Sequence, residues 1–263
     1  TVPLSVTFSH DTENAETLRW DFGDGTLLDV LPDDPPVERV FTRAGTHRVT
    51  LTAIDSDGQG QRSDPVTVTI TVFSGPLDRI TLDPPNATLV VGQSVKFNVK
   101  AFDQFDNRIQ SPLIQFQATP DSGRIDENGN FRAGPVAGRY QSAVTVEASQ
   151  GPVVRTASAD VSLEPGPLHH ATLELDRPDV AAGSRFQATA LAFDEFDNLL
   201  TDIELEYSVD ASVAIVDGIG FFLAGANLGT FTQAMTVEAR QNGLTAEAEA
   251  DIIVSPGPMH TVA

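Results

Sequence analysis

The sequence contains no cysteine, a single tryptophan, two tyrosines and few basic residues. Without cysteine, disulfides, thiol nucleophiles, zinc ribbons and iron–sulfur clusters are excluded. Sixteen lysines and arginines stand against 37 aspartates and glutamates, which gives a net charge of -21. A surface of that sign repels phosphate backbones and anionic lipid headgroups, so nucleic-acid and membrane-surface binding are disfavoured. No apolar run approaches the length of about 18 residues that a membrane span needs.

The chain does contain an internal repeat. Gly75-Pro-Leu77 recurs as Gly166-Pro-Leu168 and as Gly257-Pro-Met259, 91 residues apart each time. Aligning residues 75–165 on 166–256 without a gap gives 28 identities in 91 positions. This level of identity at a fixed offset indicates a tandem duplication.

The repeat sets the expected domain organisation. We expect a β-sandwich at 1–74, one repeat at 75–165, a second at 166–256, and at 257–263 the first strand of a truncated further repeat. The sequence is then expected to be a piece of a longer modular chain. The junctions at 163–168 and 254–259 are short and contain proline, which restricts the backbone, so we expect a semi-rigid rod.

Alternation of apolar and polar residues with a period of two dominates all three units. In the stretch 66–72, Val66, Val68, Ile70 and Val72 alternate with three threonines, and no helical stripe of useful length occurs. Gly-, Pro-, Asn- and Asp-rich turns separate the strands, for example at 126–130. Several short strands in about 90 residues predict an all-β fold of tandem, antiparallel, immunoglobulin-like β-sandwiches.

Residues 1–74 carry a specific motif. It comprises Trp20-Asp-Phe-Gly-Asp-Gly-Thr26, Phe41-Thr-Arg-Ala-Gly-Thr-His-Arg-Val-Thr-Leu51 and Asp55-Ser-Asp-Gly58. These segments closely resemble the PKD (polycystic kidney disease) domain family. The stretch 27–39 departs from the family pattern as a longer, acidic loop. The resemblance implies a β-sandwich in which the motif tryptophan is buried.

The two 91-residue units resemble the bacterial immunoglobulin-like repeats of large surface proteins and adhesins. The resemblance is carried by Gly123, Asp126, Gly129, Phe131, Ala133, Gly134, Gly138 and Tyr140. In that setting such modules act as spacers, adhesive arms or contacts between chains. The resemblance therefore implies an extracellular or cell-surface location in a prokaryote.

Calcium is the one cofactor that the residues suggest, although no cofactor is required. Side chains with oxygen atoms, which are the ligands that a hard cation requires, cluster after the expected strands. The candidate ligands are Asp55, Asp57, Asp103, Asp106, Asn107, Asp194, Asp197 and Asn198. Equally, Asp and Asn after a strand favour the turn that ends it. Both interpretations stay open for these residues, whereas we interpret 126–130 as a turn.

Other site types find less support. No Gly-x-Ser-x-Gly, His-Glu-x-x-His or phosphate-cradling glycine loop occurs, and we expect neither catalytic nor cofactor-binding residues. His169 and His170 are neighbours on an expected strand, so their rings would point to opposite faces. Asn86 begins the one Asn-x-Thr sequon, a candidate glycosylation site.

Polysaccharide binding is the rival function for a β-sandwich module. It usually needs exposed aromatic rings, but the alternation places Tyr140 and Tyr207 on apolar faces, and Trp20 is expected to be buried. We therefore expect a non-catalytic spacer, adhesion or assembly segment of a secreted or cell-surface protein, in a surface layer, sheath or filament. Its expected partners are copies of itself or other surface proteins. The alternative is an accessory region of a secreted polysaccharide- or protein-degrading enzyme.

Overall fold

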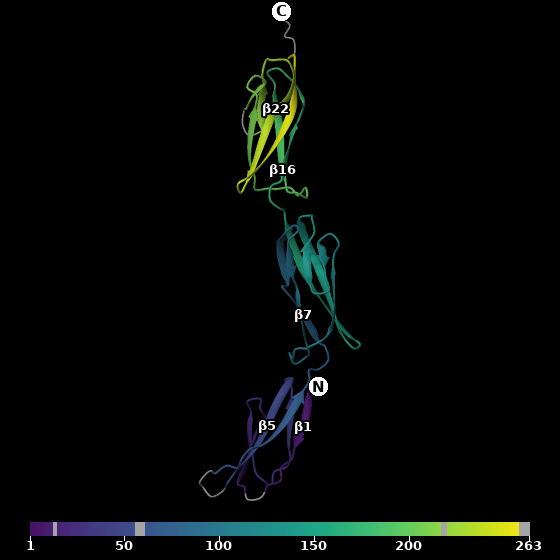
Figure 1. Cartoon of the computed structure of the whole chain (residues 1–263), viewed down its shortest axis with the longest axis vertical. Coiled ribbons are helices and arrows are strands. Elements are labelled where there is room, and N and C mark those ends of the chain that lie inside the picture. Colours follow the sequence, from purple (N-terminus) through teal and green to yellow (C-terminus); the bar gives the residue numbers. More distant parts are fainter. Residues whose placement is uncertain (13–14, 56–60, 217–219, 258–263) are drawn as a thin grey trace, which may run out of the picture.

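A computed structural model describes residues 1–12, 15–55, 61–216 and 220–257. Figure 1 shows three β-sandwiches arranged end to end along one long axis. The described residues form strands and no helix, and so hold no helix able to cross a bilayer. The predicted all-β fold and extended rod are confirmed.

The first sandwich, called sandwich 1, packs a two-stranded sheet β1-β4 against a four-stranded sheet β3-β2-β5-β6. Its core is aromatic, with Phe8, Trp20, Phe22 and Phe41 all buried. Its strands are β1 (Leu4–Phe8), β2 (Thr17–Asp21), β3 (Leu27–Val30), β4 (Val37–Phe41), β5 (Gly45–Ile54) and β6 (Val66–Val72).

Sandwich 2 contains nine strands in three sheets, ordered β10-β7, β12-β13-β9 and β11-β14-β15-β8. The strands are β7 (Arg79–Asp83), β8 (Asn86–Val90), β9 (Ser94–Lys96), β10 (Asn98–Phe102), β11 (Leu113–Ala118), β12 (Gly123–Ile125), β13 (Asn130–Ala133), β14 (Gly138–Gln150) and β15 (Val153–Glu164).

The described residues of sandwich 3 form eight strands in two sheets, ordered β16-β18-β21-β20 and β17-β23-β22-β19. The strands are β16 (His170–Leu175), β17 (Asp179–Ala181), β18 (Arg185–Phe193), β19 (Glu204–Val209), β20 (Ala214–Val216), β21 (Phe221–Ala224), β22 (Gly229–Gln241) and β23 (Leu244–Ser255). The long hairpin β22–β23 lies 91 residues after β14–β15, with the same bounds in each repeat.

The strand order is that of an immunoglobulin-like sandwich. In sandwich 3 the two sheets correspond to strands A-B-E-D and A′-G-F-C of that fold. The pairing departs from a purely antiparallel one, because β8 pairs parallel to β15 and β17 pairs parallel to β23. Prolines at 84–85 and 178 interrupt the first strand of each repeat, and its second half then joins the opposite sheet.

Alternating apolar residues of the long hairpins are buried in both repeats. Val144 and Val146 are fully buried, as are their counterparts Met235 and Val237. In sandwich 1 the prediction fails for half of one strand. Val72, at the end of β6, is buried, but Val66 and Val68 are 67% and 52% exposed. The aromatic core packs against Val72 and Ile70, so the first half of β6 runs beyond it.

The turn from β12 to β13 gives a test of the fold. Gly129 has φ 80°, and a Cβ there would lie 2.3 Å from the Phe97 carbonyl oxygen. Gly92 also has a positive φ, 77°, but a Cβ added there would have no atom within 4 Å. We predict that Gly129→Ala lowers the unfolding free energy of sandwich 2 by more than about 2 kcal/mol, against about 1 kcal/mol for Gly92→Ala. Equal costs by chemical denaturation would contradict the described turn.

Candidate functional site

Two matching networks of polar contacts lie where one sandwich meets the next. The loop Asp103–Asn107 follows β10, and the loop Asp194–Asn198 follows β18. In each, the fourth residue adopts a left-handed conformation, with φ 63° at Asp106 and at Asp197. This geometry turns each loop back so that its last residue, an asparagine, faces the preceding sandwich.

Asp103 is completely buried, and N–H groups surround its carboxylate. It accepts hydrogen bonds from the backbone nitrogens of Gly75 at 2.7 Å, Phe105 at 2.9 Å and Asn107 at 2.9 Å. The side-chain amide of Asn107 donates to it at 3.0 Å. Because Gly75 begins the junction between the sandwiches, this carboxylate ties the junction to the loop.

Asn107 carries the connection into sandwich 1. Its Nδ2 donates to the Thr42 carbonyl at 2.8 Å, and its Oδ1 accepts from the Ala44 nitrogen at 2.7 Å. The amide therefore pairs with the backbone of the turn between β4 and β5 as a neighbouring strand would. We call Thr42, Ala44, Gly75, Asp103 and Asn107 joint 1.

The same arrangement recurs between sandwiches 2 and 3. Asp194 is also fully buried, and accepts from Gly166 N at 2.7 Å and from the Asn198 side chain at 2.8 Å. Asn198 donates to the Pro135 carbonyl at 2.8 Å and accepts from Ala137 N at 2.7 Å. These five residues form joint 2, in which each bond described above for joint 1 has a counterpart.

Two further contacts support the joints. A glutamine at the end of each long strand accepts from the junction: Gln150 from Leu77 N at 2.7 Å, and Gln241 from Leu168 N at 3.0 Å. In joint 1, Phe105 packs against the core of sandwich 1. Each joint therefore combines a buried carboxylate, an amide clamp and a glutamine.

The joints differ in one ion pair. In joint 1, Arg79 donates to Asp106 at 2.6 Å and its guanidinium lies 4.2 Å from the centre of the Phe102 ring. In joint 2 the corresponding side chain is His170, which lies 3.4 Å from Asp197 and stacks on Phe193 at 5.2 Å. The sequence position, the aspartate and the aromatic ring are retained, while histidine replaces arginine.

The hydrogen bonds keep both joint carboxylates ionised. Burial alone would raise the pKa of Asp103, but donors from Gly75 and Asn107 outweigh it and lower that pKa. Burial alone would also raise the pKa of Asp194, but hydrogen bonds from Asn198 and Gly166 outweigh it and lower that pKa. A carboxylate with a lowered pKa stabilises the folded state at neutral pH and loses that contribution on acidification.

The structure puts the calcium candidates in three situations. Asp103, Asn107, Asp194 and Asn198 form the joints, whereas Asp106 and Asp197 are exposed beside Arg79 and His170. Asp55 is described, and Asp57 lies outside the described residues. Within the described ranges, no three His, Asp or Glu side chains are grouped to hold a metal ion. Calcium binding stays a prediction.

The remaining candidates are placed as follows. The 126–130 turn is confirmed, since the Asp126 carboxylate accepts from Asn128 N and from both the backbone and side chain of Asn130. Asn86 is exposed at the start of β8, and its glycosylation stays a prediction. The prediction that the rings of His169 and His170 point to opposite faces is wrong, because β16 begins at His170 and the two Nδ1 atoms lie 3.4 Å apart.

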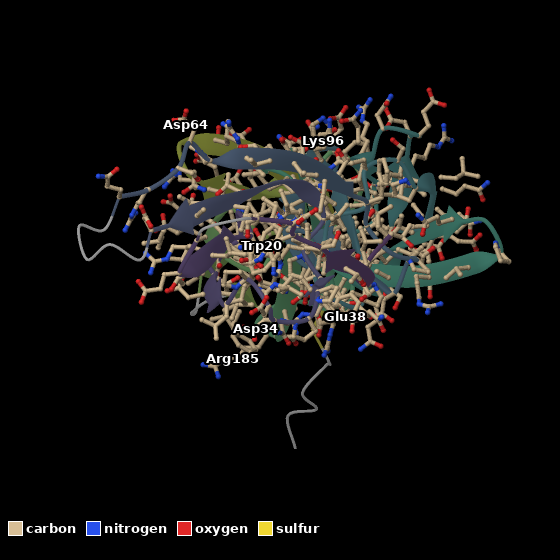
Figure 2. The ribbon with its side chains drawn as sticks, turned by 90° about the horizontal axis from the view of Figure 1, so that it is seen from below. Trp20, Asp34, Glu38, Asp64, Lys96 and Arg185 are labelled. Carbon is tan, nitrogen blue, oxygen red and sulfur yellow. The ribbon has the colours of Figure 1, made fainter. Side chains whose placement is uncertain are left out.

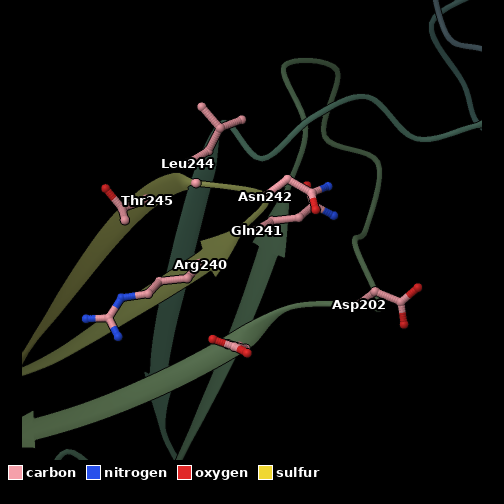
Figure 3. A pocket seen from close by; sticks show the side chains of 8 residues that line it. Asp202, Arg240, Gln241, Asn242, Leu244 and Thr245 are labelled. Atoms are coloured by element: carbon pink, nitrogen blue, oxygen red, sulfur yellow. The ribbon is translucent and has the colours of Figure 1, made fainter.

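A polar recess lies beside the tip of the β22–β23 hairpin and has a volume of about 570 Å³. Figure 3 shows it between Asp202 and the strand that carries Arg240. Arg240 is paired with Glu238 at 2.7 Å and with Glu206 at 2.8 Å. Trp20 is buried, as expected, and the ring of Tyr207 packs against the core of sandwich 3. None of the eight residues lining the recess is aromatic, so they offer no stacking face for a sugar.

The Trp20–Thr26 motif forms a tight turn in sandwich 1. Gly23 has φ 69°, and a Cβ there would lie 2.6 Å from the Arg48 carbonyl oxygen. Burial would raise the pKa of Asp24, but hydrogen bonds from Thr26 and Arg39 lower it to about 2. Arg39, which reaches this turn at 2.6 Å, belongs to the stretch that departs from the family pattern.

The lowered pKa of Asp103 gives a test of joint 1. Its stabilising contribution is present above the ordinary aspartate pKa of about 3.9 and is lost as the pH falls through the lower folded value. We predict that Asp103→Asn lowers the melting temperature at pH 7, and that the difference from wild type shrinks below about pH 4. A difference that is constant between pH 7 and pH 3, measured by calorimetry, would contradict the described hydrogen bonds.

Comparisons with known proteins agree with the motif. The family model for the PKD domain matches residues 1–70. No curated protein matches the chain by sequence.

Several solved structures align over most of the chain. The Escherichia coli adhesin FdeC aligns with 96% of this chain and 88% of its own, at 18% identity and a TM-score of 0.48. Drosophila N-cadherin EC1-4 covers 88% of this chain and 69% of its own, at 15% identity and a TM-score of 0.41. Mouse protocadherin-24 EC1-3 covers 92% and 90%, at 12% identity and a TM-score of 0.41. By the family-model match to residues 1–70, sandwich 1 is a PKD domain, and two immunoglobulin-like sandwiches follow it in this chain.

Proposed function

We propose that this chain is a non-catalytic spacer segment of a secreted or cell-surface prokaryotic protein, in which the two joints hold the sandwiches at fixed angles. A spacer of this kind extends the chain and presents its sides to partners. The observation that carries the proposal is the duplicated joint. A flexible tether would not need two buried carboxylates and two asparagines that bond the preceding sandwich at matching positions, because these bonds restrict its motion.

The chemistry of the joints supports a mechanical role. Each asparagine makes two hydrogen bonds to the backbone of the preceding sandwich, so it constrains both the distance and the rotation of that sandwich. Each buried aspartate makes the clamp costly to open, since its carboxylate would lose donors or would have to be hydrated. Relative motion of domains is the default where interfaces are small, and these bonds oppose it.

The surfaces of the two repeats support a spacer whose sides differ. Sandwich 2 belongs to a stretch with 10 acidic and 8 basic residues, and sandwich 3 to one with 15 and 3. The joints are retained while the surface charge diverges. We infer that the architecture is shared and that lateral contacts are specific to each sandwich.

Removing both clamps tests the proposal. The double variant Asn107→Ala/Asn198→Ala loses the bonds across both joints. Asn130→Ala is the matched control, because Asn130 bonds an aspartate four residues earlier in the same way but within sandwich 2. We expect each substitution to cost about 1–2 kcal/mol locally.

The readout is small-angle X-ray scattering of the whole chain. The wild type and Asn130→Ala should scatter as one rigid rod, and the double variant as sandwiches on flexible connections with a broadened distance distribution. A wild type that already scatters as a flexible chain, or a double variant as rigid as the control, would overturn the proposal.

A further inference from the structure

The edge of sandwich 1 has an unusual strand. In the sheet order β3-β2-β5-β6, β6 is the outermost strand and, in the described part of the chain, pairs only with β5. Figure 2 looks along the rod and labels Asp64, two residues before β6 begins, at the periphery of the molecule. Among the described residues, β5 is the one strand paired with β6, and the N-terminal segment reaches this edge only beyond its end, where Val2 N donates to the Phe73 carbonyl at 2.9 Å.

The composition of β6 leaves this edge unprotected. Its sequence, Val-Thr-Val-Thr-Ile-Thr-Val, has no charge, proline or glycine over seven residues. Edge strands usually avoid pairing through charged side chains, prolines, bulges or short length. The edges β3 and β19 follow that rule, since β3 carries Asp29, which is paired with Arg19, and β19 carries Glu204 and Glu206. The edges β8 and β11 are uncharged as well, but they are shorter than β6, with five and six residues.

Two valines add apolar surface to the same edge. Val66 is 67% exposed and Val68 is 52% exposed, although both alternate in register with the buried Val72. The three threonines of β6 on the opposite face are also exposed. The first half of β6 is thus open on both faces as well as along its edge.

The sequence of β6 is self-complementary. It reads the same in both directions around Thr69, apart from the exchange of Val68 for Ile70. In an antiparallel pair related by a two-fold axis at Thr69, Val66 faces Val72 of the other strand, Val68 faces Ile70, and Thr67 faces Thr71. Each apolar β-branched residue then faces another valine or isoleucine, and each threonine faces a threonine. Such cross-strand pairs stabilise a sheet.

We infer that β6 is the surface through which a second copy of this chain pairs, antiparallel and two-fold symmetric about Thr69, to give a continuous eight-stranded sheet. This symmetry is what a self-pairing edge requires and what a different partner strand would not need. The inference rests on the proposed function, because it names the lateral contact of the spacer. Since β6 runs towards joint 1, the two rods overlap at sandwich 1 and extend in opposite directions.

The contact is small. One strand pair of seven residues buries less than the area of a standard stable interface, so isolated chains pair weakly and transiently. A covalent trap is the suitable probe, and the cysteine-free sequence makes one simple to design. Opposed residues of antiparallel strands have Cα atoms about 4.5–5.5 Å apart, within the range that a disulfide spans.

The experiment uses single cysteines in the whole chain under mild oxidation. Thr69→Cys should form a disulfide dimer, because Thr69 meets its own copy at the axis. Thr67→Cys and Thr71→Cys should each remain monomeric alone but cross-link when mixed, because each faces the other. Thr88→Cys is the control, as Thr88 is an exposed threonine on β8, an edge strand of sandwich 2.

The outcomes separate this inference from its alternatives. We expect Thr69→Cys to dimerise at least tenfold more than Thr88→Cys, and Val68→Lys in the same chain to remove most of that difference. Equal yields for Thr69 and Thr88, or Thr67→Cys cross-linking as well alone as in the mixture, would overturn the pairing. The joint variant Asn107→Ala/Asn198→Ala should still cross-link through Thr69, so failure of the rigid rod is distinguishable from failure of this contact.

Discussion

A buried carboxylate needs hydrogen-bond donors, and at each joint Asp103 or Asp194 obtains one of them from the junction that connects two sandwiches. The donors are N–H groups of the loop itself and of Gly75 or Gly166. The loop can therefore satisfy its aspartate only when the junction has the observed path. That path brings Asn107 or Asn198 to the backbone of the preceding sandwich, and the orientation of the rod follows from this requirement.

Both repeats retain the residues that make these hydrogen bonds, whereas the charge of their surfaces differs. The second and third sandwiches share the aspartate, the asparagine and the supporting glutamine at the same offset, whereas the Arg79–Asp106 ion pair beside the loop is replaced by a contact between His170 and Asp197. Exposed ion pairs contribute little stability, so this exchange is tolerated. A buried carboxylate without its donors is far costlier, which explains why the joint is the constant element.

Much of the fold could be predicted from the sequence. Alternation identified the inward faces of the long hairpins because both sheets cover them, as with Val144 and Met235. The same pattern misled for Val66 and Val68, since alternation shows that residues share a face and not that the core reaches them. The parallel pairing of β8 and β17 escaped prediction because it depends on where the first strand changes sheets.

The sequence singled out the joint residues, but their hydrogen bonds between sandwiches were not predicted. Retention of Asp103–Asn107 and Asp194–Asn198 in both repeats singled these residues out, and oxygen-rich loops suggest cations. In the structure the carboxylates of Asp103 and Asp194 accept N–H bonds, from partners that include Gly75 and Gly166, 28 residues earlier in the chain. The partners Thr42 and Ala44 carry no side-chain signal, because they act through the backbone. The retained Gln150 and Gln241 were a signal that could have been used.

The most direct measurement of the central claim is the distance between sandwiches 1 and 2 in solution. Spin labels on Thr7→Cys in β1 and Thr156→Cys in β15, both exposed, report this distance by pulsed electron–electron double resonance in the otherwise cysteine-free chain. The account predicts one narrow distance distribution that broadens with Asn107→Ala and is unchanged by Asn130→Ala. A broad distribution in the otherwise unaltered chain, or none of the expected broadening in Asn107→Ala, would contradict it.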